Sequence, residues 1–148
     1  MIIKNPTQLN AYVQKKSKET QVSEQAILQS YMTERLLERL SYSDYKTKFI
    51  PTTEATTSYV SDSIPAIPPE LEFTVKGVTL TEESLRKIFR EICFVRIRDD
   101  VAIEIEDIQK LSGMSSLARF RISLKALYAT LRIPMYVYIS VKSHGLKK

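Results

Sequence analysis

The chain has 148 residues, of which 43% are hydrophobic and 26% charged, so a single domain with its own core is expected and wholesale disorder is excluded. No apolar run approaches the roughly 18 residues of a membrane span, and the single cysteine, Cys93, excludes an internal disulfide framework and predicts a cytoplasmic location. The formal net charge of +5 would suit nucleotides or RNA, but a charge of this size also simply keeps a small domain in solution.

The first of three zones, residues 1–50, is predicted to be helical. Asn5-Pro6 starts a helix that reaches about Lys18, and Ser23 caps a second helix that reaches about Leu40. Apolar residues spaced by threes and fours form one side of the second helix: Ile27, Leu28, Tyr31, Met32, Leu36, Leu37 and Leu40. The charged residues between them are expected to form a solvated, ion-paired face: Glu34, Arg35, Glu38 and Arg39.

The second zone, residues 51–70, breaks these patterns. A short helical piece that starts at Ser43–Tyr45 is expected to lead into it through Phe49-Ile50. The zone holds four of the six prolines, four threonines and neither lysine nor arginine. Because neither helical nor alternating periodicity survives there, an irregular loop is predicted, with room for a short strand at Thr57–Val60.

The third zone, residues 71–140, alternates apolar and polar residues around one helix, and a frayed tail, 141–148, is expected after it. The helix is capped by Thr81 and ends near Cys93. Four strands are predicted, over residues 70–76, 101–108, 117–127 and 131–140. In the second of them Val101, Ile103 and Ile105 are expected to be buried. The fold class that follows is α/β of the α+β kind, with a meander of largely antiparallel strands packed on helices.

Several kinds of chemistry are disfavoured by the residue inventory. His144 is the single histidine, which leaves no support for a serine protease triad or a histidine-rich metal site. Cys93 ends an apolar helical stripe without a visible base, which favours a buried structural thiol over a nucleophile. The three glycines, Gly77, Gly113 and Gly145, form no phosphate-binding loop.

Glu70 and Glu72 are the clearest candidates for chemistry. Two carboxylates two residues apart on one strand point to the same face, as the Mg²⁺ ligands of metal-dependent nucleotidyl transferases do. The metal would neutralise a triphosphate and activate the attacking oxygen. The alternative is that two glutamates at the start of a strand simply face solvent.

Basic and aromatic residues on the later strands also allow two interpretations. Arg119, Arg121 and Lys125 could contact phosphates, or they could pair across the sheet with Glu104 and Glu106 if those strands are antiparallel neighbours. Structural pairing is favoured for the two arginines, whereas the alternatives for Lys125 stay open.

Two further groups of residues are candidates for binding. Tyr136 and Tyr138 could stack a base, although tyrosines are also ordinary strand residues. Arg86, Lys87 and Arg90 on the helix fit a solvated face better than an RNA track.

The chain resembles the N-terminal domain of the AbiEii/AbiGii-type toxin nucleotidyltransferases over about three quarters of its length. The matching segments are Asn5–Leu9, Gln29–Ser41, Tyr45–Ile50, Phe73–Thr81, Glu104–Ile108, Arg121–Ala126 and Leu131–Met135. The resemblance implies a nucleotidyltransferase-like fold and a role as the toxin of a bacterial toxin–antitoxin or abortive-infection system. It further implies Mg²⁺, a nucleoside triphosphate, a tRNA acceptor and an antitoxin-like protein partner.

The catalytic motifs depart from the family pattern. Pro51–Glu54 stands where the family carries a Lys-Gly-Gly or Gly-Ser motif. The Asp-x-Asp metal pair falls on Glu70 and Glu72, and the third acidic position falls on Tyr138, a poor ligand for a hard cation. Beside these, Lys76 and Lys125 are expected to bind the nucleotide. The sequence ends before the C-terminal helical region of the family.

Two functional classes remain after these observations. One is a nucleotidyltransferase that transfers a nucleotide to RNA or protein and is impaired or inactive. The other is a catalytically dead relative, or an engineered scaffold, that acts as a protein- or RNA-binding module. The four departures favour loss of catalysis.

Overall fold

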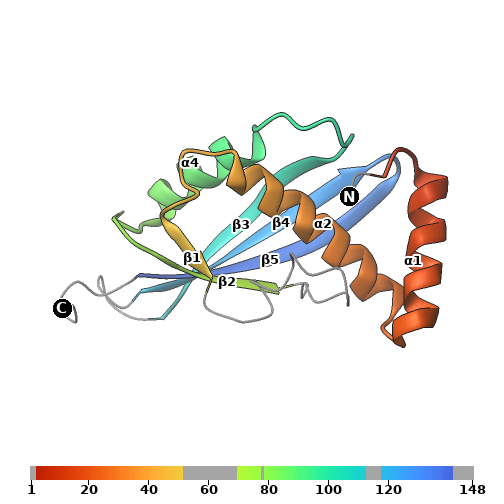
Figure 1. The fold of residues 1–148 in the computed structure, drawn as a ribbon. Helices are drawn as coiled ribbons and strands as arrows, with labels where there is room; N and C mark the ends of the chain where they lie inside the picture. The colour runs from red at the N-terminus through yellow and green to blue at the C-terminus, as the bar shows by residue number, and fades with distance from the viewer. Residues whose placement is uncertain (1–2, 52–69, 78, 113–117, 142–148) are drawn as a thin grey trace.

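The structure is a computed structural model, and it describes residues 3–51, 70–77, 79–112 and 118–141 (Figure 1). The helices within these ranges are α1 (Pro6–Thr20), α2 (Glu24–Ser41) and α4 (Glu82–Cys93). The strands are β1 (Phe49–Pro51), β2 (Glu70–Val75), β3 (Ala102–Ser112), β4 (Arg119–Tyr128) and β5 (Leu131–Val141). None of these helices combines the length and the apolar character needed to cross a membrane.

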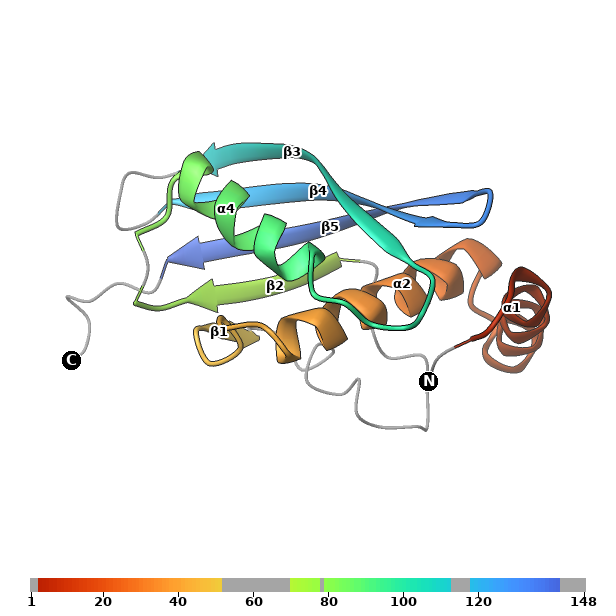
Figure 2. The ribbon, with the colours of Figure 1, turned by 90° about the horizontal axis from the view of Figure 1, so that it is seen from above.

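The strands form one mixed sheet in the order β1-β2-β5-β4-β3. β3, β4 and β5 are the predicted antiparallel meander, whereas β2 runs parallel to β5, and β1 is antiparallel to β2. α2 and α4 contact each other and pack on the same face of this sheet, and α1 packs on α2 (Figures 1 and 2). The predicted α+β class, with a largely antiparallel sheet packed on helices, is therefore confirmed.

The helices begin where the sequence predicts them to begin, because each has a side-chain cap. The side chains of Asn5, Ser23 and Thr81 each accept a hydrogen bond from the backbone N–H three residues further on, at 2.9–3.1 Å. At α4 the Ser84 hydroxyl also accepts from the Thr81 backbone N–H at 2.9 Å, which completes a capping box. Caps of this kind satisfy N–H groups that the first helical turn leaves without partners.

The piece expected to be helical at Ser43–Tyr45 is a series of turns instead. The Ser43 hydroxyl accepts a hydrogen bond from the Tyr45 N–H at 3.1 Å and donates one to the Leu40 carbonyl at 2.8 Å. A serine that bonds its neighbouring backbone in this way competes with helix formation. The chain consequently turns after α2 and enters β1.

β3 contains a bulge, and the predicted pattern of buried residues in that strand is therefore wrong at Ile105. Val101 and Ile103 are buried as expected, but Ile105 is only partly buried, and the next buried residue is Ile108. The pairing with β4 shifts between Ile105 and Asp107, which inserts one extra residue on the β3 side. The strand then continues to Ser112, beyond its predicted end.

The loop predicted over residues 51–70 lies outside the described residues except at its two ends. Pro51 belongs to β1, and Glu70 begins β2. The strand expected at Thr57–Val60 and all but the first residue of the expected tail, 141–148, also lie outside the described residues.

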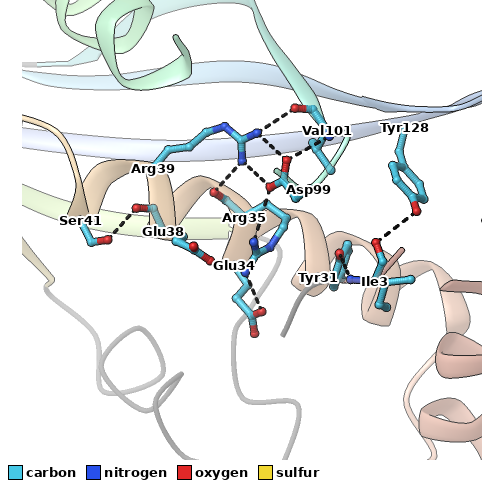
Figure 3. Close-up of polar contacts among 10 residues, drawn as sticks. All are labelled: Ile3, Tyr31, Glu34, Arg35, Glu38, Arg39, Ser41, Asp99, Val101 and Tyr128. Atoms are coloured by element: carbon cyan, nitrogen blue, oxygen red, sulfur yellow. Dashed lines mark hydrogen bonds and ion pairs between the residues drawn. The ribbon is translucent and has the colours of Figure 1, made fainter. Parts of the chain in front are cut away.

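Two arginines of α2 that were expected on a solvated face are buried instead. Arg35 is 1% exposed and Arg39 is 2% exposed (Figure 3). Arg39 donates two hydrogen bonds to the carboxylate of Asp99, from Nη1 at 2.8 Å and from Nη2 at 2.9 Å. Its Nη2 also donates to the Val101 carbonyl at 2.7 Å. The charge at this position of α2 is therefore neutralised by a residue 60 positions further along the chain.

Arg35 joins the same network from one turn earlier on α2. Its Nη1 lies 3.5 Å from Asp99, and its Nη2 lies 2.6 Å from Glu38 and 3.3 Å from Glu34. Burial opposes the charge of this guanidinium, but the neighbouring glutamates, Glu38 first, raise the pKa of Arg35 above its usual value. The prediction that these charged residues of α2 form ion pairs is confirmed, but the prediction that the two arginines are solvated is wrong. Their buried partner, Asp99, is remote in sequence and could not be anticipated from the helix pattern.

Replacing the shared carboxylate should destabilise the fold strongly. Asp99→Asn removes the carboxylate that pairs with the buried Arg39 guanidinium, while Arg35 keeps Glu34 and Glu38, and we expect the free energy of unfolding to fall by about 3–5 kcal/mol. Urea denaturation followed by circular dichroism measures this change. The matched control is Asp100→Asn, the same substitution at the adjacent exposed residue. Equal losses in both variants would contradict the importance of the network.

Candidate functional site

The face of the sheet opposite α2 and α4 carries polar and aromatic side chains, and we call it the open face. Its members on β2, β4 and β5 are partly exposed: Glu72, Thr74, Arg119, Arg121, Ser123, Tyr136 and Tyr138. They alternate along each strand with the core residues that α2 and α4 cover. Among the described residues, no helix packs on this face.

Two tyrosines occupy the middle of the open face. Tyr136 and Tyr138 are two residues apart on β5, which is the central strand of the sheet. The buried neighbours Met135, Val137 and Ile139 point into the core, so both tyrosine rings are on the opposite side. The strand thus presents two adjacent aromatic groups on one surface.

Tyr138 is in contact with a charged pair. The guanidinium of Arg119, on β4, lies over the Tyr138 ring at 4.8 Å from its centroid. The same guanidinium is 3.6 Å from the carboxylate of Glu72, on β2, and both charged side chains are about 40% exposed. A cation over an aromatic face is attracted to it and also shields one side of the ring. The three side chains form one cluster across three neighbouring strands.

The predicted metal ligands are partly brought together. Glu72 is the register partner of Tyr138, and Glu70 is the register partner of Tyr136, because β2 and β5 are parallel neighbours. Tyr138, which stands at the third acidic position of the family pattern, therefore lies beside β2, the strand that carries both glutamates. The nucleotidyltransferase interpretation requires this arrangement. The side chain of Glu70 lies outside what the structure describes.

The described side chains do not fit a Mg²⁺ ion. The Arg119 guanidinium next to Glu72 repels a divalent cation, and the phenol of Tyr138 is a poor ligand at neutral pH. Within the described ranges no three acidic, histidine or cysteine side chains are grouped as a metal site would need. The side chains that the structure describes around Glu72 therefore do not make up a Mg²⁺ site, and Glu70 stays a predicted ligand.

The two lysines expected to bind nucleotide lie at opposite ends of the sheet. Lys125 is opposite Pro134 on β5, whereas Lys76 follows Val75, which is opposite Val141. Seven residues of strand separate these positions, or about 23 Å. The structure does not bring the two lysines to a common site.

The basic residues of β4 pair within the sheet, Lys125 with one of the expected glutamates and the two arginines with other partners. β3 and β4 are antiparallel neighbours, as the pairing hypothesis required. Arg121 donates to Gln109 at 2.6 Å, and Lys125 lies 3.2 Å from Glu106. Arg119 pairs with Glu72 across β5 instead of with a residue of β3. The bulge in β3 changes which residues face β4, and alternation alone does not reveal it.

Cys93 is partly buried at the end of α4. Burial raises the pKa of its thiol from 9.0 to about 11, although Arg39 nearby lowers it slightly. A thiol with this pKa carries little thiolate at neutral pH, and the thiolate is the reactive form. The structure gives Cys93 no feature of a nucleophile.

The reactivity of Cys93 should reveal this burial. At pH 8 the shift from 9.0 to about 11 reduces the thiolate fraction by about a hundredfold, so alkylation by iodoacetamide should be slower in the folded protein than in urea by at least that factor. The folded-state rate should rise as the pH increases towards 11. Mass spectrometry at timed intervals measures both rates, and equal rates with and without urea would show that the thiol is exposed.

Sequence reasoning missed the contact between Arg119 and Glu72. The two residues are 47 positions apart, and their strands are not neighbours in the sheet. The sequence does contain one usable signal. Glu72, Arg119 and Tyr138 each alternate with buried residues along their strands, which places all three side chains on the polar face of the sheet. Only the strand order shows that these three side chains meet.

Comparisons with known proteins show a distant structural likeness. No protein-family profile matches the chain, and no curated protein matches it significantly. A solved structure of a candidate nucleotidyltransferase from H. pylori superposes with a TM-score of 0.47 and 13% identity. The aligned region covers 86% of this chain and 49% of that one, so the chain spans about half the length of the H. pylori protein. Similarity at this level assigns neither a family nor an activity.

Proposed function

We propose that the chain is a nucleotidyltransferase-like domain that recognises single-stranded RNA on its open face and has lost metal-dependent transfer. The observation that carries the proposal is the arrangement of Tyr136 and Tyr138 on the central strand, with the Arg119 guanidinium over the second ring at 4.8 Å. The remaining steps follow from the chemistry of that arrangement.

Adjacent tyrosines on a sheet face suit stacking of successive bases. Every base has an aromatic face, so stacking on tyrosine is tolerant of sequence and contributes about 1–3 kcal/mol per base. Sheet domains that bind RNA use aromatic residues on central strands in this way. Ser123 and Arg121 are the register partners of Tyr136 and Tyr138 on β4 and would add polar contacts to a bound strand.

Arg119 gives the tyrosine surface its positive charge. Its guanidinium is partly exposed and is balanced by a single described carboxylate, that of Glu72. A phosphate of a bound strand could compete for this guanidinium, because a half-exposed ion pair contributes only about 0–1 kcal/mol. Binding should therefore weaken as the salt concentration rises.

Loss of transfer is supported by the same cluster. In an active transferase the two carboxylates of the Asp-x-Asp pair would bind a metal ion that contacts the triphosphate. Here Glu72 is beside a guanidinium, and a tyrosine occupies the third acidic position. The cluster is suited to holding a base in place and is not suited to collecting cations.

The family resemblance extends this proposal to particular ligands and to a biological role. It would make a tRNA or a nucleoside triphosphate the natural ligand, and it would place the domain in the cytoplasm with an antitoxin-like partner. If transfer is lost, expression of the chain in bacteria should not arrest growth, in contrast to expression of an active toxin.

RNA binding is tested by fluorescence anisotropy with a labelled ten-nucleotide oligouridylate. We expect Tyr136→Leu/Tyr138→Leu to weaken binding by about thirtyfold or more, since two stacking contacts are removed while apolar side chains stay on the strand. Tyr42→Leu is the matched control, because Tyr42 is an exposed tyrosine outside the open face. Unchanged affinity in the double variant, with a normal thermal unfolding curve, would reject the open face as the RNA site.

Transfer is tested separately with each of the four radiolabelled nucleoside triphosphates, Mg²⁺ or Mn²⁺, total RNA and the protein itself. We expect no label to be transferred, with an active nucleotidyltransferase as the positive control. Label that disappears in Glu70→Gln/Glu72→Gln would show that the two glutamates still hold a metal. That outcome would overturn the loss of catalysis and leave the RNA-binding result untouched.

A further inference from the structure

A groove runs between the end of α4 and the outer edge of the sheet, and we call it the edge groove. Its volume is about 300 Å³, and its lining includes Arg86, Arg90, Phe94, Ile103, Glu104 and Ile105. The first three residues lie on α4 or at its C-terminal cap, and the other three are consecutive on β3. This groove is separate from the open face.

The lining shows that the groove follows the strand edge. Side chains of consecutive strand residues point to opposite faces of a sheet. A hollow that touches Ile103, Glu104 and Ile105 together therefore lies along the edge of β3 and not on one face. β3 is the last strand of the sheet, and in the described part of the chain it pairs with β4 alone. Its outward N–H and C=O groups are the template that an added strand would use.

The α4 side of the groove offers two kinds of contact to such a strand. Phe94 is 76% exposed, the largest exposed fraction among the large hydrophobic side chains described. Arg86 and Arg90 are one helical turn apart and lie on the same side of α4. Arg86 also lies 3.5 Å from Glu82, and both of these side chains are exposed, so a bound carboxylate can replace Glu82.

We propose that the edge groove binds an extended acidic segment of a partner protein, which adds as a strand to the edge of β3. Alternate residues of that segment would face α4, where apolar side chains contact Phe94 and carboxylates pair with Arg86 and Arg90. The bulge that follows Ile105 limits the regular edge to the first residues of β3, so the segment is short.

An acidic peptide fits the edge groove better than a second copy of the chain or a nucleic acid does. A second copy of the chain, paired edge to edge about Glu104, would place like carboxylates opposite each other, and each copy carries a net charge of +5. A nucleic acid would leave Phe94 and the hydrogen-bonding groups of the strand edge unused. An acidic peptide uses both the apolar and the cationic groups, with the backbone edge between them.

The probe is a fluorescein-labelled peptide with the sequence Ser-Asp-Ser-Leu-Ser-Leu-Ser-Asp. Its binding to the full chain is followed by fluorescence anisotropy. We expect Arg86→Gln/Arg90→Gln to weaken binding by about tenfold, from the loss of two exposed ion pairs. We expect Phe94→Ser to weaken it by about fivefold, from the loss of apolar contact. A probe with lysine in place of aspartate should bind at least tenfold more weakly than the acidic probe.

The matched control is Lys15→Gln/Lys18→Gln, which removes the same charge from exposed residues of α1. It should leave the affinity for the probe unchanged, and every variant should unfold at the temperature of the parent chain. Equal weakening by the control would reduce the effect to net charge and overturn the proposal. So would a groove variant that weakens oligouridylate binding while probe binding is unchanged.

Amide chemical shifts provide the second readout. The probe should shift the amide resonances of Ile103, Glu104 and Ile105 and protect the outward-facing ones from hydrogen exchange. A probe with N-methylated backbone amides cannot pair with a strand edge and should lose binding. Shifts confined to α4, with no change on β3, would mean that the segment does not add as a strand.

Discussion

The buried pairing of Arg39 with Asp99 is the interaction on which the arrangement of layers depends. It joins the last turn of α2 to the residues that lead into β3, and Arg39 also donates a hydrogen bond to the Val101 carbonyl just before that strand. Hydrophobic contacts alone would allow the helix to slide on the sheet, because they have no direction. The two hydrogen bonds from the Arg39 guanidinium to Asp99 are directional, so they hold the helix at one position on the sheet. Breaking this pair is costly because a buried charge is left unpaired.

The two charged clusters of the molecule differ in burial, and this difference sets their roles. Around Asp99 the side chains are almost fully buried, so the charges stabilise a fixed geometry. Around Tyr138 the Arg119–Glu72 pair is about 40% exposed, so its stabilising effect is small and either partner can exchange for a ligand. A buried ion pair is therefore part of the frame, and a half-exposed pair is suited to recognition.

The edge of β3 and the open face present different groups to solvent. The open face offers aromatic rings, whereas the edge groove offers backbone hydrogen-bonding groups flanked by arginines and Phe94. Two separate surfaces of this kind would let one domain hold RNA and a protein segment together. That combination is consistent with a binding module and requires no catalytic turnover.

Local structure could be predicted from the sequence, because the caps at Asn5, Ser23 and Thr81, the apolar stripes and the alternation of the strands depend on residues within a few positions of each other. The position of Tyr138 at an acidic site of the family follows from the resemblance alone and stays a prediction. Three features emerge only when the chain is folded: β2 runs parallel to β5, α2 buries its arginines, and Arg119 contacts Glu72. These depend on strand order and on counter-charges 47 to 64 residues away, and short-range periodicity carries no information about either.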